Sequence, residues 1–115
     1  KVTSQIIVVE SPLDAVRLAA VGIDGGVATY GALVSKEQIN LIRGVENVYI
    51  AMDNDDAGRE SSMKLLEASR EMGFECMFFN YEKTTAKDVG GMSKSEILYG
   101  LENAKHSVRG YKAFA

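Results

Sequence analysis

Short apolar runs that alternate with helix-like segments constrain the fold of this 115-residue chain more than any other feature. The run at residues 5–9 is rich in β-branched residues, which is typical of a strand buried on both faces. Runs of similar character occupy residues 26–30, 48–52 and 76–79. Strands that alternate with helices form mainly parallel sheets, so the sequence predicts an α/β fold with helices flanking the sheet.

Capping residues mark the helix boundaries between these runs. Ser11 and Pro12 suit the N-cap and first position of a helix, and Gly22 suits its end. Capping boxes at residues 35–38 and 93–96 predict two more helices. A longer helix is predicted from the turn at Gly58 to about Met72, with Gly73 at its end.

Composition and length predict one soluble domain, residues 1–115, with a core at about 5–105. No apolar run is long enough to span a bilayer. The first residue is Lys1 instead of Met, so we expect a segment excised from a longer chain. The single cysteine, Cys76, cannot form an internal disulfide, and it lies in an apolar run, so we expect it in the core. We expect a cytoplasmic protein. The net charge of −3 argues against tight, autonomous binding of nucleic acid.

Acidic residues follow three of the predicted strands. Glu10 directly follows the first strand, Asp53 and Asp55 follow the strand at 48–52, and Asp88 lies in the loop after the strand at 76–79. The carboxyl ends of parallel strands meet at one edge of a sheet, where binding sites form. We therefore expect these side chains to gather at one edge.

The spacing of Asp53 and Asp55 suits a hard divalent cation, because Mg²⁺ needs only one or two protein carboxylates besides water and substrate phosphates. Acids at the start of a helix also cap it, and the pair alone favours capping and metal binding about equally. For Asp56 capping is the better interpretation. Asp14 is ambiguous between a capping box with Ser11 and a site one turn after Glu10. For Glu10 the sequence offers no structural role.

The ordered motifs resemble the Toprim domain, in the version found in bacterial and phage DNA primases. The resemblance rests on Ile-Ile-Val-Val-Glu10-Ser-Pro-Leu-Asp14, Ala28-Thr29-Tyr30-Gly31, Ala51-Met52-Asp53-Asn54-Asp55-Asp56-Ala57-Gly58-Arg59 and Lys87-Asp88. It covers the chain from about Ile6 to Asp88. Ser11 stands where the primase pattern has glycine, and no second acid follows Asp88 closely, which leaves the subfamily open.

The resemblance implies a compact, Rossmann-like fold with a mainly parallel four-stranded sheet. It implies that Glu10 acts as general acid or base, and that Asp53 and Asp55 bind Mg²⁺ or Mn²⁺ with Asp14 and Asp88 in the same cluster. Arg59 is either a phosphate contact or a solvated helix residue. Lys87 is a candidate contact to substrate or nucleotide triphosphate.

The resemblance predicts a DNA primase-type nucleotidyltransferase that makes RNA primers on single-stranded DNA. Template and ribonucleotides would be bound through neighbouring domains, with a replicative helicase as a candidate partner and no membrane association. The isolated domain should be weakly active at best. Two alternatives stay open: a Toprim nuclease that cleaves phosphodiesters, and a non-catalytic phosphate- or nucleotide-binding α/β module of the receiver type.

Overall fold

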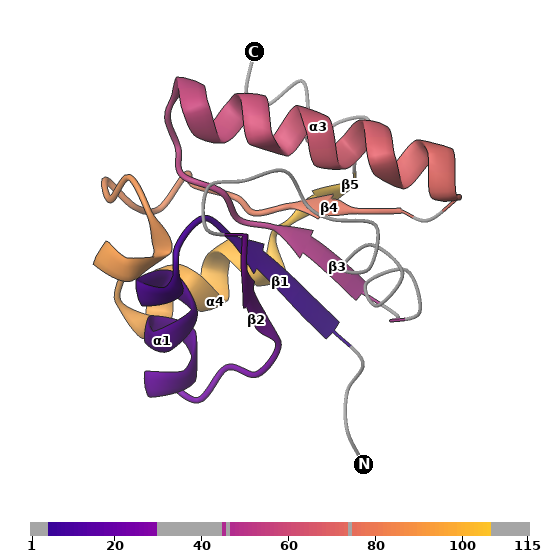
Figure 1. Cartoon of the computed structure of the whole chain (residues 1–115). Coiled ribbons are helices and arrows are strands. Elements are labelled where there is room, and N and C mark those ends of the chain that lie inside the picture. The colour runs from indigo at the N-terminus through magenta and orange to yellow at the C-terminus, as the bar shows by residue number, and fades with distance from the viewer. Residues whose placement is uncertain (1–4, 30–44, 46, 74, 107–115) are drawn as a thin grey trace.

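The computed structural model describes residues 5–29, 45, 47–73 and 75–106 of the chain. Its sheet has the strand order β2-β1-β3-β4-β5 (Figure 1). The strands are β1 (Gln5–Val9), β2 (Gly26–Ala28), β3 (Asn47–Ile50), β4 (Met77–Phe78) and β5 (Lys105–His106). The first four strands run parallel and β5 pairs antiparallel with β4. The predicted mainly parallel α/β sheet is confirmed.

The predicted capping signals mark most of the helix ends. The helices are α1 (Pro12–Ala20), α3 (Asp56–Met72), the 3₁₀ turn η1 (Val89–Gly91) and α4 (Lys94–Glu102). Ser11 is the N-cap of α1, and Ser93 caps α4 in a capping box with Glu96. Gly73 ends α3 in the left-handed region at φ 79°, which glycine adopts without a Cβ penalty.

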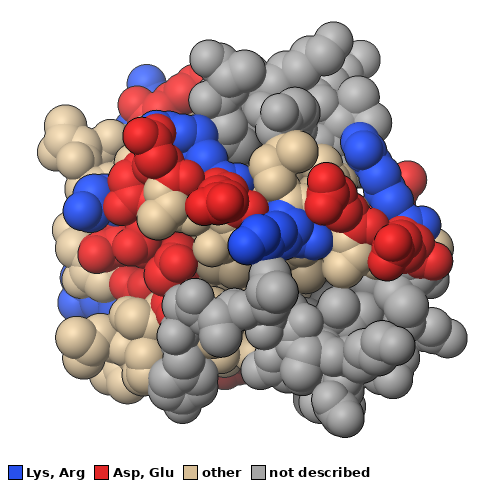
Figure 2. Space-filling model, turned by 45° about the horizontal axis from the view of Figure 1, so that its top comes forward, with Lys and Arg blue, Asp and Glu red and all other residues tan. Residues whose placement is uncertain are grey.

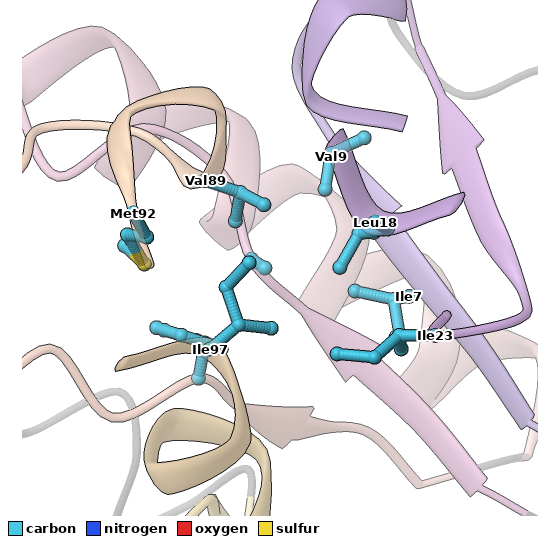
Figure 3. Packing of buried hydrophobic residues seen from close by; sticks show 9 residues of the cluster. Ile7, Val9, Leu18, Ile23, Val89, Met92 and Ile97 are labelled. Atoms are coloured by element: carbon cyan, nitrogen blue, oxygen red, sulfur yellow. The ribbon is translucent and has the colours of Figure 1, made fainter. Parts of the chain in front are cut away.

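Two hydrophobic clusters lie on opposite faces of the sheet. Ile7 and Val9 of β1 pack with residues of α1, η1 and α4, while Val8 packs with residues of α3. Figure 1 shows α3 on the face of the sheet opposite to α1 and α4. Figure 3 shows Leu18, Ile23, Val89, Met92 and Ile97 converging on the first of these faces. The alternation follows from the two-residue period of a strand and explains why residues 6–9 are all apolar.

Cys76 belongs to the cluster under α3 and is fully buried. Burial raises the pKa of its thiol to about 11, and a hydrogen bond with Ser69 opposes that shift in part. The prediction of a core cysteine is confirmed.

The structure corrects one detail of the predicted fold, the number of strands. The sheet has five strands instead of four, because residues 105–106 add a two-residue antiparallel strand beside β4. In α1, Leu18 is buried, but Leu13 and Val16 lie 75% and 62% exposed. The helix predicted from the capping box at residues 35–38 falls outside the described residues.

Among the helices in the described ranges, none has the length and apolarity that crossing a membrane requires.

Candidate metal and phosphoryl-transfer site

The strand order reverses its direction between β1 and β3, which lie side by side at the centre of the sheet. From β1 the chain proceeds outward to β2, and from β3 it proceeds outward in the other direction to β4. Right-handed crossovers then place α1 and α3 on opposite faces, as Figure 1 shows. In open α/β sheets a crevice forms outside the carboxyl ends of the two strands at such a reversal. Glu10 follows β1 at this place, and Asp53 lies three residues beyond the end of β3.

A direct contact joins these two strand ends. The backbone N–H of Asp53 donates to Oε1 of Glu10 at 3.3 Å. Because Glu10 follows β1, this hydrogen bond ties the turn after β3 to the end of β1, and the Glu10 side chain is half-buried. The sequence offered no structural role for Glu10, and the structure supplies one, since its partner lies 43 residues away along the chain.

Close backbone packing shapes the turn after β3. A Cβ on Gly58 would lie 1.8 Å from the carbonyl oxygen of Asp53, so this position requires glycine. Asp55 is the N-cap of α3, and its Oδ1 accepts from the N–H of Gly58 at 2.8 Å. The capping role expected of Asp56 thus belongs to Asp55. Asp56 lies in the first turn, fully exposed, and pairs with Arg59 at 2.8 Å.

Asp53 carries a buried oxygen that is left without a partner. Its Oδ1 is the buried side-chain atom within the described residues that makes no hydrogen bond. Burial contributes most to raising the pKa of the Asp53 carboxyl to about 6. The other causes are negative charges, in decreasing order those of Glu10, Asp14, Asp88 and Asp55. An unpaired buried carboxylate is costly, and a cation at Oδ1 would relieve that cost.

Asp14 and Asp88 hold the neighbouring loops. Asp14 is buried, and its Oδ1 accepts from the N–H of Gly90 at 2.8 Å while Oδ2 accepts from the N–H and the hydroxyl of Ser11 at 3.3 Å. Asp88 is the N-cap of η1 and accepts from the N–H of Gly91 at 3.0 Å. Both acids therefore accept hydrogen bonds from backbone N–H groups. Their negative charges also help to raise the pKa of Asp53.

A hollow of about 560 Å³ lies beside these loops, between α1 and η1. Asp14 and Asp88 line it together with the exposed α1 residues Leu13 and Val16. Figure 2 shows acidic side chains gathered at the left of that view, the end of the molecule where α3 begins in Figure 1. Glu10, Asp53 and Asp55 do not line the hollow, so it borders the acidic edge on the side of α1.

Two basic side chains border the acidic turn. Arg59, in the first turn of α3, contacts Asp56 and lies 3.4 Å from the Asn54 side-chain oxygen. The ammonium of Lys87 lies 3.6 Å from Oδ2 of Asp55. Both cations are bound to acids of the turn in this structure, and exposed ion pairs of this kind contribute little stability and exchange readily.

Tyr81 supports the turn that carries Asp53, a role that the sequence did not reveal. Its hydroxyl donates to the carbonyl of Met52, directly before Asp53, and its ring meets Phe79 edge-on at 4.9 Å. Burial, with Asp53 as the largest charge contribution, raises the pKa of the phenol well above its usual range, so it stays a donor. A tyrosine in a loop carries no sequence signal for such a contact, because the partner strand is known only from the fold.

A divalent cation fits this arrangement only with help from a substrate. Within the described residues no three acidic, histidine or cysteine side chains lie close enough to form a complete metal site. Oδ1 of Asp53 accepts no hydrogen bond, and Oδ2 of Asp55 takes no part in the cap of α3, so both are candidate metal ligands. Mg²⁺ commonly takes one or two carboxylates and completes its shell with water and phosphate oxygens, which this pair satisfies.

Comparison with known families identifies the family to which the chain belongs. A family model described as Toprim-like matches residues 7–91, which include β1, the acidic turn after β3 and η1. A DNA primase of Haemophilus influenzae is 44% identical over 64 residues, which are 55% of this chain and 11% of that protein. The chain thus spans about a tenth of the curated relatives that it matches.

Solved structures show the same fold. A DNA primase domain from Pseudomonas aeruginosa superposes with a TM-score of 0.76 at 27% identity, over 92% of this chain and 35% of that one. A DnaG primase catalytic domain bound to ssDNA gives a TM-score of 0.72 at 28% identity, over 96% of this chain and 36% of that one.

Proposed function

Because the chain belongs to the Toprim-like family, we propose that it is the catalytic domain of a DNA primase that performs Mg²⁺-dependent nucleotidyl transfer. The observation that carries the proposal is the unpartnered, buried Oδ1 of Asp53 at the strand-order reversal. The similar DNA primases include a catalytic domain solved with ssDNA, which supports a single-stranded DNA template, and the proposed primase reaction would join ribonucleotides on it. In the longer protein, neighbouring domains would bind the template.

Asp53 and Asp55 are the residues that would hold the metal. A bound Mg²⁺ would neutralise charge on the transferring phosphate and orient it for in-line displacement. Oδ1 of Asp55 caps α3, which leaves Oδ2 for a metal in place of Lys87, and the backbone of Asp53 is held by Gly58 and Glu10. These contacts hold the turn in place without a ligand, which favours precise positioning.

Glu10 is the group that would hold a proton during transfer. Its carboxylate accepts from the backbone N–H of Asp53, so it lies next to a residue that would hold the metal. A positioned carboxylate of this kind can accept the proton of an attacking hydroxyl. Arg59 and Lys87, at the rim of the turn, would contact phosphate oxygens after releasing their present acidic partners.

The metal assignment is tested by titrating Mn²⁺ into the chain and following NMR line broadening. Broadening should centre on residues 53–58, and Asp53→Asn or Asp55→Asn should weaken Mn²⁺ binding about tenfold or more. Asp56→Asn is the matched control, because it removes the same charge from the same turn at a fully exposed side chain. Equal effects of the three variants would show that charge alone attracts the ion.

The reaction is tested in the longer protein that contains these residues. Glu10→Gln should lower primer synthesis about 100-fold or more, while Glu67→Gln, exposed on α3, should not change it. Cleavage of a phosphodiester by the wild-type protein without primer synthesis would replace this proposal with the nuclease alternative.

A further inference from the structure

Lys87 occupies the side of Asp55 that a metal would need. The two oxygens of Asp55 have different partners: Oδ1 accepts from the N–H of Gly58 at 2.8 Å, and Oδ2 faces the ammonium of Lys87 at 3.6 Å. Capping fixes the carboxylate, so Oδ2 is the oxygen that remains for a cation. A cation placed between Oδ2 and the unpartnered Oδ1 of Asp53 therefore competes with the lysine.

The backbone of Lys87 is anchored at this place while its side chain is not. Its carbonyl accepts from the N–H of Asn54, inside the acidic turn, at 2.7 Å. The next residue, Asp88, caps η1 and so fixes the loop on the other side. The Lys87 side chain is 65% exposed, which leaves it free to change rotamer without moving the backbone.

We infer that the Lys87 ammonium pairs with Oδ2 of Asp55 only while no metal ion is bound there. Without metal its ammonium reduces the repulsion within the acidic cluster, and on metal loading it leaves Oδ2 and turns to a phosphate of the incoming nucleotide. Lys87 is thus a positioning residue that opposes binding of the bare ion and favours binding of the ion together with a polyphosphate. The inference rests on the proposed function, since it takes Asp53 and Asp55 as metal ligands.

The magnitudes permit this exchange. An exposed lysine–carboxylate pair at 3.6 Å contributes little net stability, because side-chain entropy and solvent screening offset the attraction. A divalent ion would be held by Asp53 and by phosphate oxygens as well as by Asp55, so it can displace an ammonium that pairs with Asp55. The anchored backbone then keeps the released ammonium near the phosphates, where lysine acts as a point charge.

Binding of Mn²⁺ to the Lys87→Met and Lys83→Met variants tests the first half of the exchange. Lys83 lies in the same loop, and its ammonium sits over the ring of Tyr99 at 5.8 Å, so its loss removes an equal charge without touching Asp55. Lys87→Met should bind Mn²⁺ about two- to fivefold more tightly than wild type, and Lys83→Met should match wild type at 0.15 M salt.

Inorganic triphosphate added with Mn²⁺ tests the second half. Wild type should bind this probe about fivefold more tightly than Lys87→Met, because only wild type supplies the released ammonium. Without Mn²⁺ the advantage of wild type should disappear. Thermal melting of both variants should stay near wild type, since both side chains are exposed.

The outcomes separate the two proposals. Mn²⁺ binding at residues 53–58 that is unchanged or weaker in Lys87→Met would overturn the exchange and leave the metal site standing. Absence of Mn²⁺ broadening at these residues in every variant would overturn both.

Discussion

The two acidic turns at the centre of the sheet edge are held in place by different parts of the chain. After β1, the side chain of Asp14 does the holding, by accepting from Ser11 on one oxygen and from Gly90 on the other. After β3, backbone packing at Gly58 and the cap from Asp55 hold the turn. The side chain of Asp53 is left with a buried oxygen that nothing in the described structure satisfies.

The difference separates two kinds of buried carboxylate. One whose oxygens all serve backbone donors stabilises the fold, and one that is buried without donors opposes it. Of the acids that the Toprim resemblance groups together, Asp14 is the most engaged by the protein and Asp53 the least. Substitutions in the two turns should therefore change stability in opposite directions.

Gly58→Ala should have the largest effect. The added methyl would lie 1.8 Å from the Asp53 carbonyl oxygen, so the turn or the start of α3 must move, at about 3 kcal/mol of unfolding free energy. Urea unfolding measures the loss. Gly73→Ala, at the other end of the same helix, meets no atom within 4 Å and should lose only about 1 kcal/mol through its positive φ. Equal losses of unfolding free energy in the two variants would show that close packing at Gly58 does not hold the turn.

Asp14→Ala should destabilise the chain by about 2 kcal/mol, because the Gly90 and Ser11 donors lose a charged acceptor. The same urea experiment detects it. Asp24→Ala is the control: this aspartate is exposed and should stay within about 0.5 kcal/mol of wild type. Wild-type stability in Asp14→Ala would mean that the turn after β1 is also held by its backbone.

Asp53→Asn should have the smallest effect, with the opposite sign. The folded-state pKa of about 6 exceeds the ordinary 3.8, so between these values the native state binds more protons than the unfolded state. The unfolding free energy of metal-free wild type should then fall as pH rises from about 4 to 6 and stay level above that range.

Asparagine cannot titrate there, so Asp53→Asn should gain about 1 kcal/mol over wild type at pH 7, a figure reduced for partial exposure and screening. Near pH 4 the gain should vanish. Glu67→Gln, exposed on α3, should follow wild type at every pH. A variant that loses stability at pH 7 would show that the Asp53 carboxylate is satisfied in solution.

The parts of this arrangement that depend on neighbours along the chain were predictable from the sequence. The strand at 5–9 and the N-cap at Ser11 coincide with the structure, and Gly73 and the capping box at Ser93 mark helix boundaries as predicted. Each depends on local chemistry: β-branched runs, side-chain oxygens near free N–H groups, or a left-handed glycine. The convergence of acids at one sheet edge followed from the parallel order of the strands.

Features decided by distant partners were not predictable in the same way. The strand at Lys105–His106 has two residues, too few to show a period, and it exists because β4 offers an edge. The contact of Glu10 with the Asp53 backbone needs the register of β1 and β3. Choosing Asp55 over Asp56 as the cap needs the backbone angles of one turn, since both acids fit the sequence rule.

Burial of Cys76 has a consequence for labelling chemistry. The thiolate is the species that attacks maleimides and iodoacetamides, and a thiol with a pKa of about 11 forms little of it at neutral pH. The side chain is also out of reach of a reagent while the domain is folded. An introduced thiol such as Asp56→Cys, fully exposed beside the acidic turn, can therefore carry a fluorophore or spin label without replacing the native cysteine.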